Sequence, residues 1–158
     1  SKALDITEHE SKENERRILR SIVEFGNIDV KEIMKSRVDI AAIDKSFDFK
    51  SVLEIILRSG FSRIPVFDQQ IDKVVGVLYI KDLLPHLDEH SNFSWYKLCR
   101  PAYFVPETKM INDLLKEFQS KKNHLAIVVD EYGGTSGLVT LEDVVEEIVG
   151  EINDEFDI

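Results

Sequence analysis

An internal repeat is the feature that most constrains the fold of this chain. Residues 38–68 align with residues 100–130 at a constant separation of 62 positions. The separation then falls to 61, as between Asp82 and Asp143, because one residue is lost in a turn. Two copies of one supersecondary unit at such a period usually bury each other's apolar faces. We therefore expect two similar halves that share a core.

Each copy carries the same succession of hydrophobic patterns. A short apolar strand comes first, then an amphipathic helix, two further strands joined by a polar turn, and a final helix. In the first copy the expected ranges are 38–43, 52–57, 64–67, 74–79 and 80–84. In the second copy they are 102–105, 110–118, 126–129, 137–140 and 141–149. The pattern predicts a mixed α/β fold with the order β-α-β-β-α, repeated.

The apolar stripes of the two central helices define the expected core. They are Val52, Leu53, Ile56 and Leu57 in the first copy, and Met110, Ile111, Leu114, Leu115 and Phe118 in the second. The apolar runs 64–67 and 126–129 are typical of strands buried on both faces. Residues 85–95 are expected to be a polar connector between the copies.

Outside the repeats, residues 1–27 predict a helix with an apolar stripe at Ile18, Leu19, Ile22 and Val23. This helix either connects to an upstream domain or packs on the core, and the two interpretations are compatible. The expected domains are therefore 1–27, a connecting helix; 28–88, the first repeat; 89–150, the second repeat; and 151–158, an acidic tail. The chain starts at Ser1 without methionine, so we expect a piece of a longer protein, with a further C-terminal domain beyond the tail.

Composition excludes several functional classes. Thirty acidic against 20 basic residues give a net charge of −10, which disfavours sequence-independent binding of nucleic acids. The single cysteine, Cys99, excludes an internal disulfide and a multi-cysteine zinc site. No apolar run is long enough for a membrane span, and no cationic amphipathic segment suggests direct insertion. Catalytic and metal-binding motifs are missing, so we expect neither an enzyme nor a metal site.

The most informative residues stand where the third strand of each copy meets the following helix. In the second copy, Thr140 ends the strand and Asp143 follows three residues later. This spacing fits a capping box, in which the two side chains satisfy the first turn of the helix. The same geometry can hold a ligand, with the helix start facing an anion and the carboxylate accepting hydrogen bonds from ribose hydroxyls. Local sequence favours the cap.

The whole pattern resembles a tandem pair of CBS domains. The motifs that carry the resemblance are SRIPV in the first copy, DEYGGTSGLVTLED in the second and the acidic ending GEINDEFD. Together they are similar to the CBS pair of the CorC/HlyC family, the hemolysin-like magnesium and cobalt transport proteins. The resemblance covers residues 28–157, and it implies two repeats packed about a pseudo-twofold axis with two clefts that commonly bind adenine nucleotides.

The resemblance also assigns residues to these clefts. In the better cleft, Asp143 would hold the ribose and Thr140 the ribose-phosphate region. The other residues implied there are Ser36, Arg37, Val38 and Ala41 along the base or phosphates, Phe61 and Ser62 as a wall, and Arg63 or His124 toward the phosphates. A surface ion pair is the alternative for Arg63. Lys35-Ser36 replaces the usual Thr-Pro of the family.

The second cleft departs from the family pattern. Tyr79 stands where threonine is expected, opposite Asp82 and with Tyr103 nearby in the pattern. Because a phenol is bulky, we expect this cleft to be weak or empty.

The resemblance implies a regulatory module that binds ATP or AMP, with or without Mg²⁺, and controls an attached ion transporter. It further implies a homodimer, attached transmembrane and C-terminal domains, and a cytoplasmic location at the inner face of the plasma membrane. Two alternatives stay open. One is a structural dimerisation module without a ligand, and the other is direct binding of divalent cations by the acidic tail.

Overall fold

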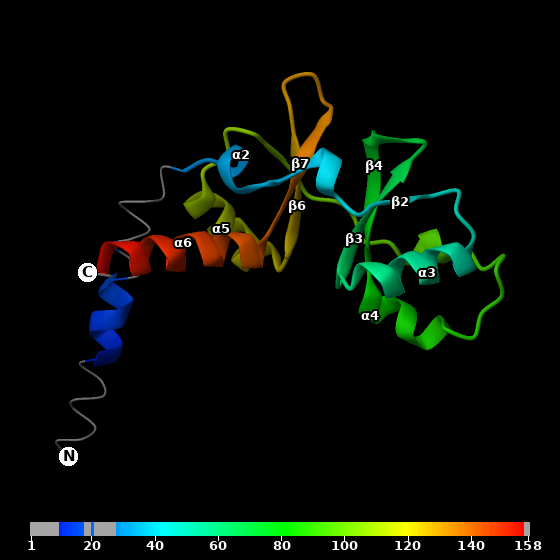
Figure 1. Ribbon diagram of the computed structural model, residues 1–158, viewed down its shortest axis with the longest axis horizontal. Coiled ribbons are helices and arrows are strands. Elements are labelled where there is room, and N and C mark those ends of the chain that lie inside the picture. The colour runs from blue at the N-terminus through cyan, green and yellow to red at the C-terminus, as the bar shows by residue number, and fades with distance from the viewer. Residues whose placement is uncertain (1–9, 18–19, 21–27, 157–158) are drawn as a thin grey trace, which may run out of the picture. The chain divides into compact units, whose positions relative to one another are not determined.

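The computed structural model describes residues 10–17, 20 and 28–156, with the backbone alone over 151–156 (Figure 1). The described chain divides into two compact units. The helical unit comprises the chain up to Met34, Glu107–His124 and the chain from Val139 onward. The sheet unit comprises Lys35–Pro106 and Leu125–Leu138. The apolar stripe expected between residues 18 and 23 lies outside the described residues.

The first copy has the expected β-α-β-β-α order. Its elements are β2 (Ile43–Asp44), α3 (Phe49–Ser59), β3 (Arg63–Asp68), β4 (Gln70–Tyr79) and α4 (Ile80–Leu83). Strands β2 and β3 are parallel, β3 and β4 are antiparallel, and the three form one sheet. A parallel pair needs a crossover, and α3 supplies it.

Helix α3 has clear start and stop signals. The Asp48 carboxylate accepts a hydrogen bond from the Ser51 N–H at 2.8 Å, and so caps the helix start. The helix ends at Gly60, whose φ of 68° lies in the left-handed region that glycine adopts without steric cost.

The second copy repeats the order with β5 (Phe104–Pro106), α5 (Ile111–Lys121), β6 (Leu125–Val129), β7 (Thr135–Thr140) and α6 (Leu141–Phe156). Its sheet has the order β1-β7-β6-β5, in which the short strand β1 (Lys35–Ser36) pairs with β7. The expected mixed α/β fold class is confirmed. Helix α6 runs past Gly150, where the sequence suggested the beginning of a tail.

The core of the sheet unit lies between α3, β3, β4 and α4. Its buried members are Ile43, Phe49, Val52, Ile56, Ile64, Val66, Leu78, Leu83 and Trp95. The expected stripe on α3 is therefore correct at Val52 and Ile56. It is wrong at Leu57, which is 83% exposed, because the buried face of α3 runs through Phe49 instead.

Two further expectations about the sheet unit are wrong. Residues 38–43 do not form a strand: Arg37–Asp39 is a 3-10 turn, η1, and only Ile43 belongs to a strand. The segment 85–95 is not only a polar connector, because Trp95 at its end is fully buried. The indole N–H of Trp95 donates to the Phe47 carbonyl at 2.7 Å, which fixes the segment to the core.

The helical unit is built from α2 (Val30–Ile33), α5 and α6, which lie side by side (Figure 1). Ile111, Leu114 and Phe118 of α5 are buried, as the sequence predicted, and so are Val144 and Ile148 of α6. Met110 precedes α5 and is exposed. Across residues 10–17, 20 and 28–156, no helix has the length and apolar character that a membrane crossing requires.

Candidate functional site

Thr140 and Asp143 face each other across the first turn of α6, in the helical unit. The Thr140 N–H donates to Asp143 Oδ2 at 3.0 Å, and the Asp143 N–H donates to Thr140 Oγ1 at 3.1 Å. This reciprocal pair is the capping box that the spacing predicted. Both residues are only partly buried, so the pair is accessible to solvent.

The capping pair keeps hydrogen-bonding capacity for a ligand. A threonine hydroxyl has one donor hydrogen and two lone pairs, and an ionised carboxylate has two acceptor oxygens. Within the described part of the chain, neither the Thr140 hydroxyl hydrogen nor Asp143 Oδ1 has a partner. The pair can therefore donate one hydrogen bond and accept others while it continues to cap the helix.

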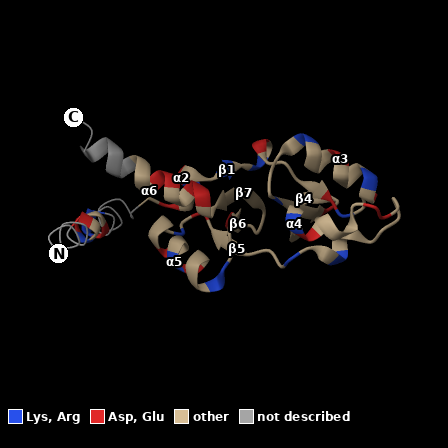
Figure 2. Cartoon of the chain, turned by 90° about the horizontal axis from the view of Figure 1, so that it is seen from below, with Lys and Arg blue, Asp and Glu red and all other residues tan. Residues whose placement is uncertain are grey.

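Other acidic side chains surround Asp143. A hollow of about 510 Å³ is lined by Glu32, Ile33, Asp143, Glu146, Glu147 and Gly150. Figure 2 shows the acidic residues of α2 and the start of α6 in red. A field of this sign repels phosphate but not the hydroxyls of a sugar. Among the residues that the structure describes, no three His, Cys, Asp or Glu side chains group as a metal site requires.

His124 is half-buried in the same unit. Its carbonyl accepts the Leu141 N–H at 2.9 Å, which fixes the beginning of α6. The structure therefore gives the backbone of His124 a role in positioning Thr140 and Asp143, whereas the sequence suggested a side-chain role toward phosphates. That side-chain role stays a prediction.

The sheet unit holds the other candidate residues. Ser36, Arg37 and Val38 follow one another through β1 and η1, and all three are exposed. Phe61 and Ser62 stand at the corner between α3 and β3, and both are exposed as well. Val38 is 84% exposed and Phe61 45%, so apolar side chains lie open both where the base or phosphates were expected and where a wall of the cleft was expected. Ala41 is half-buried.

A contact that the sequence analysis missed joins these two segments. The ammonium of Lys35 lies 4.5 Å from the ring centroid of Phe61, a cation–π contact. Lys35 therefore holds the segment that begins with Ser36 close to the corner that contains Phe61. The Ser62 carbonyl accepts the Ile80 N–H at 2.9 Å, which anchors the same corner to the start of α4.

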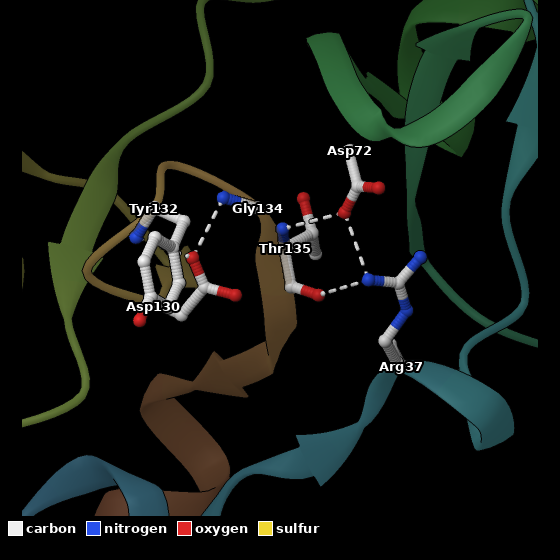
Figure 3. Close-up of polar contacts among 6 residues, drawn as sticks. All are labelled: Arg37, Asp72, Asp130, Tyr132, Gly134 and Thr135. Atoms are coloured by element: carbon white, nitrogen blue, oxygen red, sulfur yellow. Dashed lines mark hydrogen bonds and ion pairs between the residues drawn. The ribbon is translucent and has the colours of Figure 1, made fainter.

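Arg37 is tied to two other segments of the sheet unit (Figure 3). Its Nη1 donates to Asp72 Oδ1 at 2.8 Å and to the Thr135 carbonyl at 3.1 Å. The Thr135 N–H also donates to Asp72 Oδ1, at 3.0 Å. This Thr135 bond, followed by the Arg37 guanidinium, lowers the pKa of Asp72. We call Arg37, Asp72 and Thr135 the arginine clasp.

The arginine clasp fastens η1 to distant segments of the sheet unit. It joins η1 to β4 and β7, which are 35 and 98 residues away along the chain. The turn before β7 is shaped by Asp130, whose Oδ1 accepts the N–H groups of Tyr132 and Gly134 (Figure 3). A Cβ at Gly134 would lie 3.1 Å from carboxylate oxygens of Asp130 and Asp72, so the crowded turn favours glycine.

The residues of the second cleft are already engaged with a partner that the sequence did not suggest. Arg100 Nε and Nη2 donate to the two carboxylate oxygens of Asp82 at 2.9 and 3.0 Å. The same guanidinium lies 4.1 Å from the ring centroid of Tyr79. The hydrogen bonds from Arg100 lower the pKa of Asp82. Arg63, at 6.0 Å from the Tyr79 ring, faces this cluster, and Tyr103 is half-buried.

The capping pair and the exposed segments were predictable from the sequence, but their partners were not. Four unpredicted partners each contact a predicted site residue that is distant in the sequence: Lys35, Asp72, Thr135 and Arg100. One signal was available for Arg100: it stands 62 residues after Val38, so the repeat places a cation where the first copy has an apolar residue.

Comparison with known proteins identifies the family. The model of the CBS domain matches residues 30–89 and 97–150. Hemolysin C of Brachyspira hyodysenteriae is 45% identical over 145 residues, which cover 92% of this chain and 53% of the relative. The magnesium and cobalt efflux protein CorC of Vibrio cholerae is 40% identical over 158 residues, or 99% of this chain and 53% of the relative. The chain thus spans about half the length of both relatives.

A solved structure supports the same assignment. It is the CBS domain of a bacterial CNNM/CorC family Mg²⁺ transporter in complex with ATP, with 44% identity and a TM-score of 0.80. The match covers 87% of this chain and 98% of that one. With two matches to the CBS-domain model and these relatives, the chain belongs to the CBS-domain family, as a CBS pair of the CorC and hemolysin C type.

Proposed function

We propose that this CBS pair is a regulatory module that binds an adenine nucleotide through Thr140 and Asp143. The observation that carries the proposal is the unfilled hydrogen-bonding capacity of the capping pair. Asp143 Oδ1 accepts from a ribose hydroxyl, while the Thr140 hydroxyl donates toward the ribose-phosphate region. Because Asp143 Oδ2 accepts from the Thr140 N–H and Thr140 Oγ1 accepts from the Asp143 N–H, the ligand meets groups that are already oriented.

For the rest of the nucleotide, the proposal keeps the residues that the resemblance to the family implies. The proposal assigns the adenine to Val38, Ala41 and Phe61, because an apolar ligand face is bound by apolar and aromatic side chains. The hydroxyls of Ser36 and Ser62 and the cations Lys35 and Arg37 suit phosphates. Arg63 and His124 stay further candidates for phosphate contact.

Similarity to the ATP-bound CBS domain supports an adenine nucleotide as the ligand class. ATP and AMP share the adenine and the ribose that these residues are proposed to bind, and phosphates carry Mg²⁺ with few protein ligands. The acidic hollow beside Asp143 favours the sugar over the phosphates at that point, since its charge repels anions.

For the whole protein, the proposal is control of an attached magnesium or cobalt transporter. It would place this module at the cytoplasmic face of the membrane, with transmembrane and C-terminal domains in the same protein. Ligand binding controls transport only if the nucleotide favours one arrangement of the module over another. The relatives' names support an ion-transport context.

The test is a calorimetric measurement of nucleotide affinity for wild type and for Asp143→Ala. It uses ATP and AMP, each with and without Mg²⁺. Loss of the ribose acceptor should lower the affinity at least tenfold. The matched control is Asp113→Ala, which removes an exposed carboxylate from the first turn of α5. Equal affinity in wild type and Asp143→Ala would contradict the proposed site, and a loss in Asp113→Ala would show that only net charge matters.

A second candidate is a dimerisation module without a ligand. The observation that favours it is the exposure of Val145 (44%) and Val149 (46%), one turn apart on α6. Apolar side chains at this spacing form one face that a second copy can cover. If this is the whole function, sedimentation should show a dimer that Val145→Glu with Val149→Glu dissociates, and no nucleotide should bind.

A further inference from the structure

The internal repeat gives the capping pair a counterpart in the first copy. At the separation of 61 residues, Asp82 corresponds to Asp143 and Tyr79 to Thr140. At the separation of 62 residues that holds before the turn, Arg100 corresponds to Val38. The second cleft therefore differs from the first at two positions, one of which replaces an exposed apolar side chain with a cation.

The backbone of Arg100 is fixed beside β4. Its N–H and C=O both pair with Val77, each at 2.9 Å. Gly76 permits this approach, because a Cβ there would lie 3.0 Å from the Arg100 carbonyl and 3.1 Å from Cβ of Cys99. The Arg100 side chain therefore extends from a fixed backbone position close to the start of α4.

The guanidinium contacts both residues that correspond to the capping pair of the second copy. It donates one hydrogen bond to each oxygen of Asp82 and lies against the face of Tyr79. Two parallel donors on one carboxylate reproduce the pattern of two ribose hydroxyls, and the positive charge strengthens both bonds. A nucleotide that competes for Asp82 has to displace an ion pair that the chain itself supplies.

We propose that Arg100 is a built-in occupant of the second cleft and limits the chain to one nucleotide. This inference rests on the proposed function for the first cleft, but it concerns different residues and can fail separately. It also replaces the expectation that the bulk of Tyr79 alone closes the cleft, since Tyr79 serves as the surface against which the guanidinium packs.

Calorimetric titration with ATP and with AMP tests the proposal through stoichiometry. Wild type and Tyr79→Thr alone should each bind one nucleotide per chain, and Tyr79→Thr combined with Arg100→Ala should bind two. Two nucleotides on Tyr79→Thr alone would show that the bulk of Tyr79 closes the cleft, and would overturn the inference. Arg100→Gln combined with Tyr79→Thr is the second variant, because it retains side-chain bulk if alanine impairs folding, as judged by circular dichroism. The matched control is Arg58→Ala, an exposed arginine in the last turn of α3, which should stay at one.

The Asp143→Ala background separates the two proposals. There, Tyr79→Thr with Arg100→Ala should restore saturable binding of one nucleotide, which addition of Asp82→Ala abolishes. If folded Arg100 variants bind one nucleotide in the wild-type background and none in the Asp143→Ala background, Arg100 does not close the cleft and the inference is overturned, while the proposed function stands. If wild type binds none and the Arg100 variants bind one, the inference holds and the proposed first site fails.

Discussion

Replacement of Thr140 by alanine separates a helix cap from a ligand site. The substitution removes Oγ1, which accepts the Asp143 N–H at 3.1 Å in the first turn of the 16-residue helix α6. Loss of such a cap costs about 1 kcal/mol of stability. For a chain of this length, that corresponds to a fall in melting temperature of roughly 2–4 °C.

Thr140→Ala should also weaken nucleotide binding, by more than the loss of stability alone explains. Thr140→Ala also removes the donor to the ligand and one of the two bonds that orient Asp143, and each lost hydrogen bond is worth about 1 kcal/mol. The affinity for an adenine nucleotide should therefore fall at least about tenfold, since about 1.4 kcal/mol corresponds to that factor. Thr140→Ser retains the oxygen and should restore both properties.

Asp48→Ala provides the matched control, because Asp48 caps α3 through the Ser51 N–H at 2.8 Å and is not a candidate ligand contact. Thermal unfolding and calorimetry should show that Asp48→Ala lowers stability but keeps the affinity, whereas Thr140→Ala lowers both. If Thr140→Ala behaves like Asp48→Ala, the capping pair is only a cap and the reasoning is refuted.

Three further predictions follow from the sheet unit. The arginine clasp holds the pKa of Asp72 below its ordinary value of 3.8, so the stabilisation of the fold by the clasp should be present at neutral pH and lost as the pH falls through that lowered pKa. The urea midpoints of wild type and Asp72→Asn should therefore differ by a constant amount down to about pH 5 and converge in stronger acid. A difference that stays unchanged in acid would contradict this. Burial raises the pKa of Cys99 to about 11, so thiol reagents should react with it far more slowly at pH 8 than with a free thiol, and a rate equal to that of free cysteine would disprove its burial. Trp95→Ala should cost about 3–5 kcal/mol in urea unfolding, because it empties a fully buried site, and a loss below about 1 kcal/mol would show that the segment is dispensable.

The sequence predicted the parts of the fold that depend on local periodicity. The order β-α-β-β-α in both copies and the buried positions Ile111, Leu114 and Phe118 follow from spacings of two to seven residues. The Thr140–Asp143 cap was predictable for the same reason, since its partners are three residues apart. Periodicity reports which face of an element is buried, without any knowledge of the partner.

The errors and omissions concern contacts between distant residues. Residues 38–43 have a strand-like composition, but η1 takes up Arg37–Asp39, and Arg37 contacts Asp72 and Thr135 far along the chain. Trp95 lies in a polar stretch, but it packs in the core of the sheet unit and its indole N–H donates to the Phe47 carbonyl, 48 residues earlier. Tertiary contacts of this kind override local propensity, and one sequence contains no local trace of them.

The most direct test of the central claim is a calorimetric titration of the wild-type chain with ATP, AMP and adenosine. We predict saturable binding of an adenine nucleotide at one site per chain. Absence of saturable binding at millimolar concentrations of all three ligands would contradict it, and would leave dimerisation as the better explanation of this CBS pair.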